Sequence, residues 1–147
     1  MESISYMGSD HAGLQAKNEL KGYLKEKGYE VTDLGCFSEE PCDYPDIARE
    51  VGEKLREVPM SRGVLICGSG IGISIAANKM SGVRCALVYE PELVETARQH
   101  NDVNCIALGA RYTHVEKMKL ILDKFLGTAF DGDAERHARR VEKMNNM

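Results

Sequence analysis

Cys67 is the residue whose type and position most clearly suggest chemistry. It ends the apolar run Val64–Cys67 and precedes Gly68-Ser69-Gly70-Ile71-Gly72, which opens a stretch with helical spacing. A glycine-rich turn at the start of a helix directs backbone N–H groups and the helix dipole toward one point, and both favour a bound anion. The same field stabilises a thiolate. We therefore predict that Cys67 is a base or nucleophile beside a site for phosphate or an oxyanion.

Three other interpretations of this segment compete with that one. A cysteine at the end of a strand often packs as a small hydrophobe, and glycines often serve only the backbone angles of a tight turn. Glu90 also follows Gly70 by 20 residues, where a dinucleotide site would have its ribose-binding carboxylate. The spacing argues against a dinucleotide, because the run reads G-x-G-x-G and follows the third strand-like run instead of the first.

Two histidines occupy polar segments at the ends of predicted elements. His11 lies in Ser9-Asp10-His11-Ala12-Gly13, and His100 lies in Arg98-Gln99-His100-Asn101-Asp102. Histidine titrates near neutral pH and can act as a general acid toward a ring oxygen or hydroxyl, although a solvated surface histidine is an equally good interpretation of each. Asp10 is expected to accept hydrogen bonds from sugar hydroxyls, to cap the first helix, or to do both.

Arg136 and Arg140 stand four residues apart near the end of the chain, so they share one face of a predicted helix. Two guanidinium groups on one face match the oxygens of a phosphate. A solvated basic face is the alternative interpretation.

Apolar runs and helical spacing alternate along the chain. The strand-like runs are Ile4–Met7, Val31–Leu34, Val64–Cys67, Val83–Tyr89 and Val103–Leu108. Helices are expected from near Ala12 to Gly28, after Tyr44-Pro45, over Ile73–Lys79, after Glu90-Pro91 with Leu93 and Ala97 inward, over His114–Leu126 and over Ala134–Asn145. This alternation predicts one α/β domain over residues 1–147, with 128–147 as a C-terminal arm that carries an extra helix. The core is a doubly wound, five-stranded parallel sheet, flavodoxin-like or Rossmann-like, with strand order 2-1-3-4-5.

The predicted topology places the candidate residues at one edge of the sheet. Ligands of open α/β sheets bind beyond the carboxyl ends of the strands, where the strand order reverses. Asp10-His11 follows the first strand and Cys67 follows the third, so both are expected to flank the same crevice. Arg111 follows the fifth strand.

Composition excludes several classes of protein. Charged residues make up 29% of the 147 and hydrophobic residues 43%, which is typical of a globular domain. A net charge of -4 with mixed signs argues against a nucleic-acid binder and a membrane-surface helix. The five cysteines form no C-x-x-C pair, so they are expected to be reduced thiols and not a disulfide framework or a zinc site. No apolar run reaches membrane-spanning length and no signal peptide is evident, so the cytoplasm is the expected location.

Several segments together resemble one known family, the type B ribose-5-phosphate isomerases, which share a superfamily with the galactose-6-phosphate isomerase subunits. The most specific segment is Ile66-Cys67-Gly68-Ser69-Gly70-Ile71-Gly72-Ile73-Ser74-Ile75-Ala76-Ala77-Asn78-Lys79. Matching segments flank it throughout the chain: Gly8-Ser9-Asp10-His11-Ala12-Gly13, Asp43-Tyr44-Pro45, Arg98-Gln99-His100-Asn101-Asp102, Leu108-Gly109-Ala110-Arg111, Arg136-His137 and Arg140-Val141.

The resemblance implies a role for each candidate. Cys67 would move a proton between sugar carbons one and two through an enediolate, and Ser69 would shuttle a proton between the two oxygens. Backbone amides of Gly68, Ser69, Gly70, Ile71 and Gly72 would stabilise the oxyanion. His100, with Asp10, would open the furanose ring. The sugar and phosphate would be bound by Asp10, His11, Tyr44, Asn101, Arg111, Arg136 and Arg140. One branch of the family uses a glutamate as base, at the position that Ile73 occupies here, so this chain resembles the cysteine branch.

The resemblance also implies an assembly and a reaction. The family is dimeric, with the arginines of the tail reaching the partner's site, and a dimer of dimers is left open. The implied reaction is the interconversion of D-ribose 5-phosphate and D-ribulose 5-phosphate in the non-oxidative pentose phosphate pathway, without a metal or organic cofactor. Two alternatives stay open: an isomerase of allose or galactose 6-phosphate, and a nucleotide-binding module without catalysis.

Overall fold

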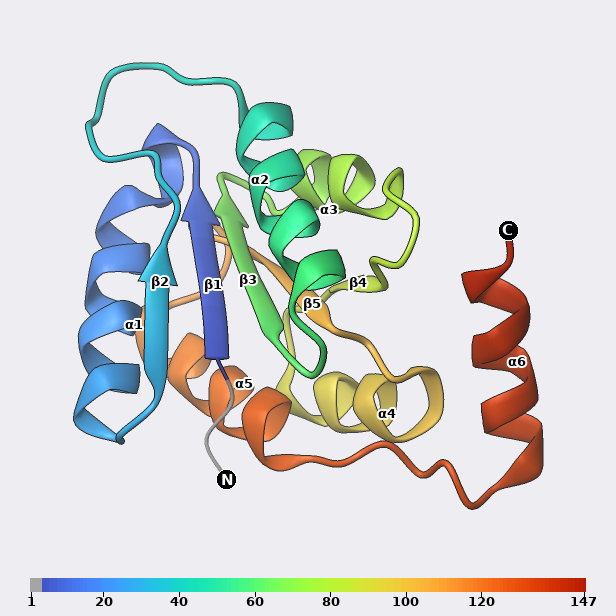
Figure 1. The fold of residues 1–147 in the computed structure, drawn as a ribbon. Coiled ribbons are helices and arrows are strands. Elements are labelled where there is room, and N and C mark those ends of the chain that lie inside the picture. The colour runs from blue at the N-terminus through green and yellow to red at the C-terminus, as the bar shows by residue number, and fades with distance from the viewer. Residues whose placement is uncertain (1–3) are drawn as a thin grey trace.

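The computed structural model describes residues 4–147 as a parallel sheet covered by helices on both faces (Figure 1). The strands are β1 (Ile4–Ser9), β2 (Glu30–Asp33), β3 (Arg62–Cys67), β4 (Cys85–Leu87) and β5 (Cys105–Gly109). The helices are α1 (Leu14–Glu26), α2 (Tyr44–Glu57), α3 (Ile71–Asn78), α4 (Pro91–Asn101), α5 (Val115–Gly127) and α6 (Glu135–Asn145), with a short 3-10 helix over His11–Gly13. The predicted doubly wound α/β fold with an extra C-terminal helix is confirmed.

The predicted strand order is wrong for the last two strands. The sheet runs β2-β1-β3-β5-β4, so β5 pairs with β3 and β4 lies at the edge. All five residues of β5 are buried, whereas β4 contains only three residues, none of them fully buried. A short, partly exposed strand suits an edge because few of its backbone groups are left unpaired there.

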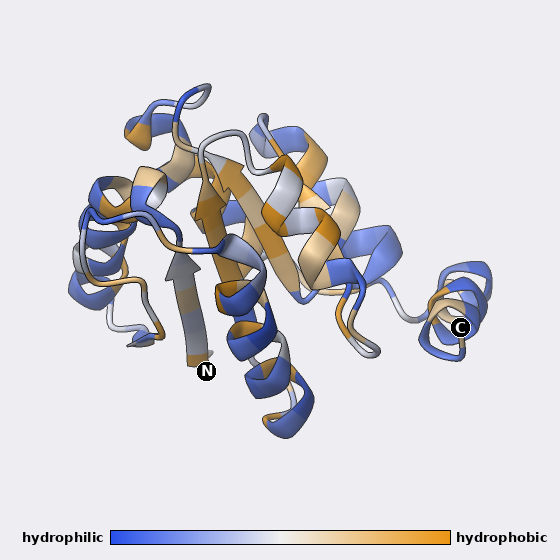
Figure 2. Ribbon diagram, turned by 90° about the horizontal axis from the view of Figure 1, so that it is seen from above, coloured by the Kyte–Doolittle hydropathy of each residue, from blue (hydrophilic) through white to orange (hydrophobic). Residues whose placement is uncertain are grey.

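The two faces of the sheet have separate cores, because successive side chains of a strand point to opposite faces. On one face, Met7 and Ile66 pack with residues of α1, α4 and α5. On the other face, Tyr6, Leu65 and Cys67 pack with residues of α2 and α3. The middle of the sheet is accordingly hydrophobic, and the helices that cover it are hydrophilic on their outer surfaces (Figure 2). Cys67 therefore leaves the sheet on the side of α2 and α3.

Two helices differ in detail from the prediction. Asp10 caps the first helical segment through a hydrogen bond from the Gly13 N–H, 3.1 Å, but that segment is a 3-10 turn and α1 begins only at Leu14. In α4, Leu93 is 58% exposed instead of inward, and Val94 and Arg98 are buried. Arg98 can occupy a buried position because its guanidinium donates to Asp102 and to the carbonyls of Val103 and Thr128.

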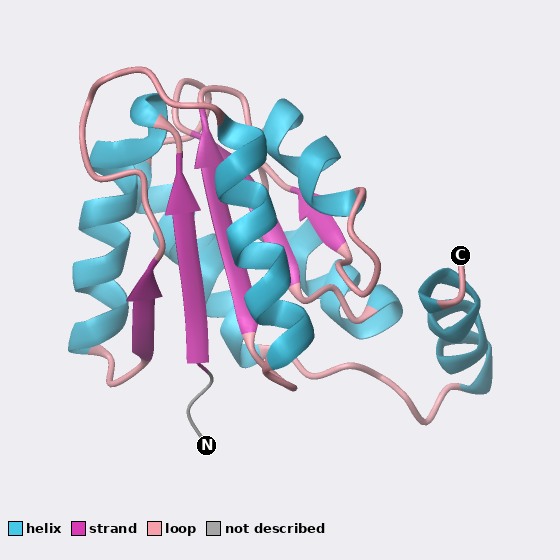
Figure 3. Cartoon of the chain, turned by 45° about the horizontal axis from the view of Figure 1, so that its top comes forward, coloured by secondary structure: helices cyan, strands magenta, loops and turns pink. Residues whose placement is uncertain are grey.

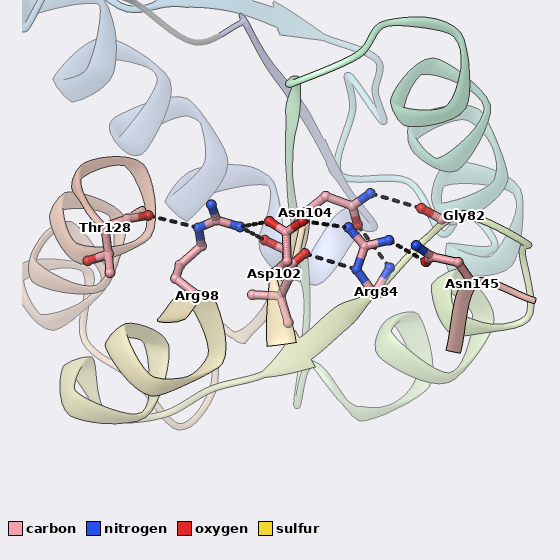
Figure 4. Close-up of polar contacts among 8 residues, drawn as sticks. Gly82, Arg84, Arg98, Asp102, Asn104, Thr128 and Asn145 are labelled. Atoms are coloured by element: carbon pink, nitrogen blue, oxygen red, sulfur yellow. Dashed lines mark hydrogen bonds and ion pairs between the residues drawn. The ribbon is translucent and has the colours of Figure 1, made fainter. Parts of the chain in front are cut away.

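Arg98 belongs to a polar cluster at the amino edge of the sheet (Figure 4). The Asp102 carboxylate pairs with both Arg98 and Arg84, and Arg84 also donates to the Asn145 side chain of α6, 2.8 Å. Asn104 joins the same cluster through bonds with the backbone of Arg84 and Gly82. These bonds connect the end of α4, the approach to β4 and the end of α6.

α6 lies beyond α4, at the end of an extended connection (Figure 3). Its inner side is held by the His137 ring, stacked on the His100 ring with centroids 4.3 Å apart, and by buried Val141. Within residues 4–147 no helix is long and apolar enough to cross a membrane.

Lys17 is a fully buried lysine that anchors the segment between β2 and α2. Its ammonium group donates to Asp33, 2.7 Å, and to the carbonyl oxygen of Cys36. Lys21 reaches the other oxygen of Asp33 at 2.9 Å. Burial by itself raises the pKa of Asp33, but the hydrogen bonds from Lys17, the Gly35 N–H and Lys21 outweigh it, so the pKa is lowered. The ionised pair thus fixes the start of a loop that forms one wall of the site described below.

Lys17→Met should reduce the free energy of unfolding by about 3 kcal/mol, because it leaves a carboxylate and a carbonyl without their buried partner. Lys21→Met, at a partly exposed position, should cost less than about 1 kcal/mol. A carboxylate with a lowered pKa stabilises the fold above its unfolded pKa and loses that effect as pH falls, so wild-type stability should decline below about pH 4. Urea unfolding at several pH values measures both the cost of each substitution and the decline of stability in acid. If Lys17→Met had the same free energy of unfolding as the wild type, and the same dependence on pH, both predictions would be wrong.

Candidate active site

Cys67 ends β3 at the carboxyl edge of the sheet, where the chain turns into α3. Its side chain is 5% exposed, and its sulfur accepts a hydrogen bond from the Gly70 N–H at 3.1 Å. Gly70 adopts φ 82°, a left-handed conformation that glycine takes without steric cost. The Ile71 N–H bonds to the Ser69 hydroxyl oxygen at 3.1 Å. The predicted nest of backbone donors therefore includes one donor aimed at the sulfur itself.

Two side chains from other elements lie directly against this turn. The Tyr44 ring, at the start of α2, stands so close to Gly72 that a Cβ there would be 2.5 Å from the ring carbon bearing the hydroxyl. The Arg111 guanidinium, just beyond β5, lies against Gly68, where a Cβ would be 3.1 Å from a terminal nitrogen. Both glycines thus permit a polar group to approach the backbone of the turn.

A cavity of about 580 Å³ opens beside the turn and brings together residues that the sequence singled out. Asp10, His11, Tyr44, Gly68 and Arg111 all line it. The backbone holds the first two in place, since the Asp10 N–H donates to the Ile66 carbonyl and the His11 Nδ1 accepts from the Cys42 N–H at 3.3 Å. The cavity offers a carboxylate, an imidazole, a phenol and a guanidinium, which are groups that bind sugar hydroxyls and a phosphate.

One chain does not bring every predicted site residue to this cavity. His100 and Asn101 end α4, which leads into the amino end of β5, so they lie at the opposite edge of the sheet from Cys67. Arg136 and Arg140 are exposed on α6, which packs on α4. Within a single chain His100 therefore does not meet Asp10.

The contact between His100 and His137 has an electrostatic consequence. Burial lowers the pKa of His137, and the neighbouring His100, Arg136 and Arg140 lower it further. His137 is therefore neutral at neutral pH, and its ring does not repel His100 electrostatically. The two rings therefore stack without charge repulsion between them.

The groups that line the site suit an anionic organic substrate. Among residues 4–147, no group of three or more His, Cys, Asp and Glu side chains is arranged to hold a metal ion. The groups that converge are backbone N–H groups, hydroxyls, an imidazole, the Arg111 guanidinium and the Asp10 carboxylate, which together suit an anionic organic molecule with hydroxyl groups.

Comparison with known proteins agrees with this geometry. The sequence model of the Ribose/Galactose Isomerase family matches residues 6–144. The chain belongs to this family. Ribose-5-phosphate isomerase B of Escherichia coli is 43% identical over 142 residues, covering 97% of this chain and 93% of that protein.

Two solved structures of family members are similar over nearly their whole length. Ribose-5-phosphate isomerase B of Clostridium thermocellum has a TM-score of 0.93 and 41% identity, covering 97% of this chain and 95% of that one. The enzyme of Mycoplasma genitalium, solved with bound ribulose-5-phosphate, has a TM-score of 0.92 and 37% identity, covering 99% and 96%.

Two residues near the candidate site of the present chain were not singled out from its sequence. Cys42 lines the cavity, but burial and the nearby Cys36 thiol raise its pKa to about 11, so it stays protonated at neutral pH and is a poor base. Tyr89 donates its hydroxyl to the Ser69 carbonyl at 2.8 Å. Its only sequence signal was its position at the end of the fourth apolar run.

Proposed function

We propose that the chain interconverts D-ribose 5-phosphate and D-ribulose 5-phosphate. The observation that carries the proposal is the Cys67 sulfur at the end of β3, with the Gly70 N–H 3.1 Å away and a polar cavity of about 580 Å³ beside it. A family member with the same fold was solved with ribulose 5-phosphate bound. The aldose and the ketose differ in the positions of two hydrogen atoms, one bound to carbon and one bound to oxygen. The reaction therefore needs a base for the carbon-bound proton and a site that stabilises the oxyanion.

The base would be Cys67. As a thiolate it takes the proton from carbon two of the open-chain aldose, and the electron pair of that C–H bond forms the double bond of the enediolate. The carbonyl oxygen at carbon one then carries the negative charge, which backbone N–H groups of the turn would stabilise. Return of the proton to carbon one gives the ketose, while Ser69 passes a proton between the two oxygens. The electrons balance within the substrate.

The rest of the cavity would hold the sugar and its phosphate. Arg111 supplies positive charge in a chain whose net charge is -4, and the His11 imidazole on the same cavity wall offers its free ring nitrogen for a hydrogen bond. The Asp10 carboxylate accepts from sugar hydroxyls, and the Tyr44 hydroxyl, fixed against Gly72, donates or accepts.

The active form would be a dimer whose sites are shared. His100 of the partner subunit would open the furanose ring together with Asp10, and the partner subunit's Asn101, the partner's Arg136 and the partner's Arg140 would bind substrate. An exposed apolar face next to the turn supports this assembly: Ile71 and Ile75, four residues apart on α3, are 48% and 58% exposed, and Leu87 of the edge strand is 36% exposed. A partner on this face would cover the open side of the site.

A hexose 6-phosphate is the second candidate substrate, because the same base and donors serve a longer aldose that fits the cavity. A coupled assay should give a higher kcat/KM for ribose 5-phosphate than for allose 6-phosphate or galactose 6-phosphate.

Cys67→Ala should lower kcat by at least about a hundredfold, as expected for loss of a general base. Cys42→Ala, the control at a thiol that lines the same cavity, should keep its activity. A hexose preference would contradict the substrate, and an active Cys67→Ala would contradict the base.

Ile75→Glu should convert the dimer into monomers and abolish activity, because it places a charge on the apolar face at its most exposed residue. Leu120→Glu is the matched control, since Leu120 on α5 is 57% exposed but lies on a different helix from the face. Sedimentation velocity and the isomerase assay measure both effects. An active Ile75→Glu monomer would exclude a site shared between subunits.

A further inference from the structure

The peptide bond between Ser69 and Gly70 is held at both of its polar ends. Its carbonyl oxygen accepts the Tyr89 hydroxyl at 2.8 Å, and its N–H donates to the Cys67 sulfur at 3.1 Å. The C=O and N–H of a trans peptide point in opposite directions. The orientation that satisfies Tyr89 is therefore the one that directs the N–H at the sulfur.

The backbone freedom of glycine allows this peptide two orientations. Gly70 has φ 82° and ψ −15°, angles typical of the third residue of a type II turn, and Ser69 stands in the position before it. Reversal of the peptide between these two residues gives a type I turn, which needs a negative φ that glycine adopts as readily. In the reversed turn the Ser69 carbonyl would face the sulfur of Cys67 and the N–H donor would be lost.

Tyr89 reaches the peptide from outside the turn. It follows β4 by two residues, and its ring lies beside the ring of Tyr112 with centroids 6.3 Å apart. The Ser69 carbonyl that it bonds lies against Gly109, where a Cβ would stand 2.4 Å from the oxygen. The edge strand and the end of β5 thus hold the carbonyl between them.

We propose that Tyr89 is a positioning residue for the reaction. Its hydroxyl selects the observed orientation of the peptide and so keeps the Gly70 N–H on the Cys67 sulfur, where an N–H donor stabilises a thiolate. The catalytic part of the proposal rests on the proposed function; the structural part does not need activity. Tyr89→Phe, which removes one oxygen atom, should lower kcat about three- to tenfold, the contribution of one neutral hydrogen bond, with KM unchanged.

The orientation of the peptide can be measured directly by NMR. The sequence contains two Ser–Gly pairs, Ser69-Gly70 and Ser81-Gly82. Serine labelled with ¹³C at the carbonyl and glycine labelled with ¹⁵N therefore give a carbonyl–amide correlation spectrum with two cross-peaks. The first reports the carbonyl that Tyr89 binds and the N–H that Cys67 accepts, and the second is an internal reference.

In Tyr89→Phe the Ser69-Gly70 cross-peak should move upfield in both the carbonyl and the amide proton dimensions, while the Ser81-Gly82 cross-peak stays in place. Tyr112→Phe is the matched control and should move neither. Cys67→Ala should move the amide proton and leave the carbonyl. A Ser69-Gly70 cross-peak unmoved in Tyr89→Phe would overturn the proposal, even if Cys67→Ala confirms the base. If the wild type shows no isomerase activity, the proposed function fails, and the cross-peak still decides whether Tyr89 orients the peptide.

Discussion

Every crossover in a parallel sheet leaves from the carboxyl edge and returns to the amino edge, and the arrangement of this protein follows from that constraint. Residues that follow a strand gather at one edge, as Asp10, Cys67 and Arg111 do. Residues that end a helix gather at the other, as His100 does. One chain therefore cannot bring both groups to one substrate, and the proposed site needs a second copy.

At the carboxyl edge, backbone geometry prepares the chemistry. Gly70 takes a left-handed conformation that lets its N–H face the Cys67 sulfur, while Gly68 and Gly72 let Arg111 and Tyr44 approach the turn. These donors are fixed by β3, α3 and the packing around them, so they need no rearrangement when charge develops on a substrate oxygen. At the amino edge, the arginine cluster and the stack of His100 on His137 fix α6.

Periodicity and turn chemistry predicted the alternation of strands and helices, and the strand-end rule placed Asp10 and His11 beside the Cys67 turn. The order of the last two strands was not predictable, because the runs that became β4 and β5 are equally apolar and only pairing decides which one is buried. Leu93 was placed inward because sequence spacing does not show that a guanidinium such as Arg98 can be satisfied inside the fold. Tyr89 was missed because a tyrosine at a strand end has many roles, and its contact with Ser69 exists only in three dimensions.

The shared site is the central claim, and mixing two inactive variants tests it most directly. Cys67→Ala and His100→Ala are unfolded together, refolded as a mixture and assayed beside each variant alone. If each site takes its base from one subunit and its acid from the other, mixed dimers contain one complete site of two. The mixture should then recover about a quarter of wild-type activity, because half of the randomly formed dimers are mixed. Activity no higher than that of the separate variants would contradict a site built from two chains.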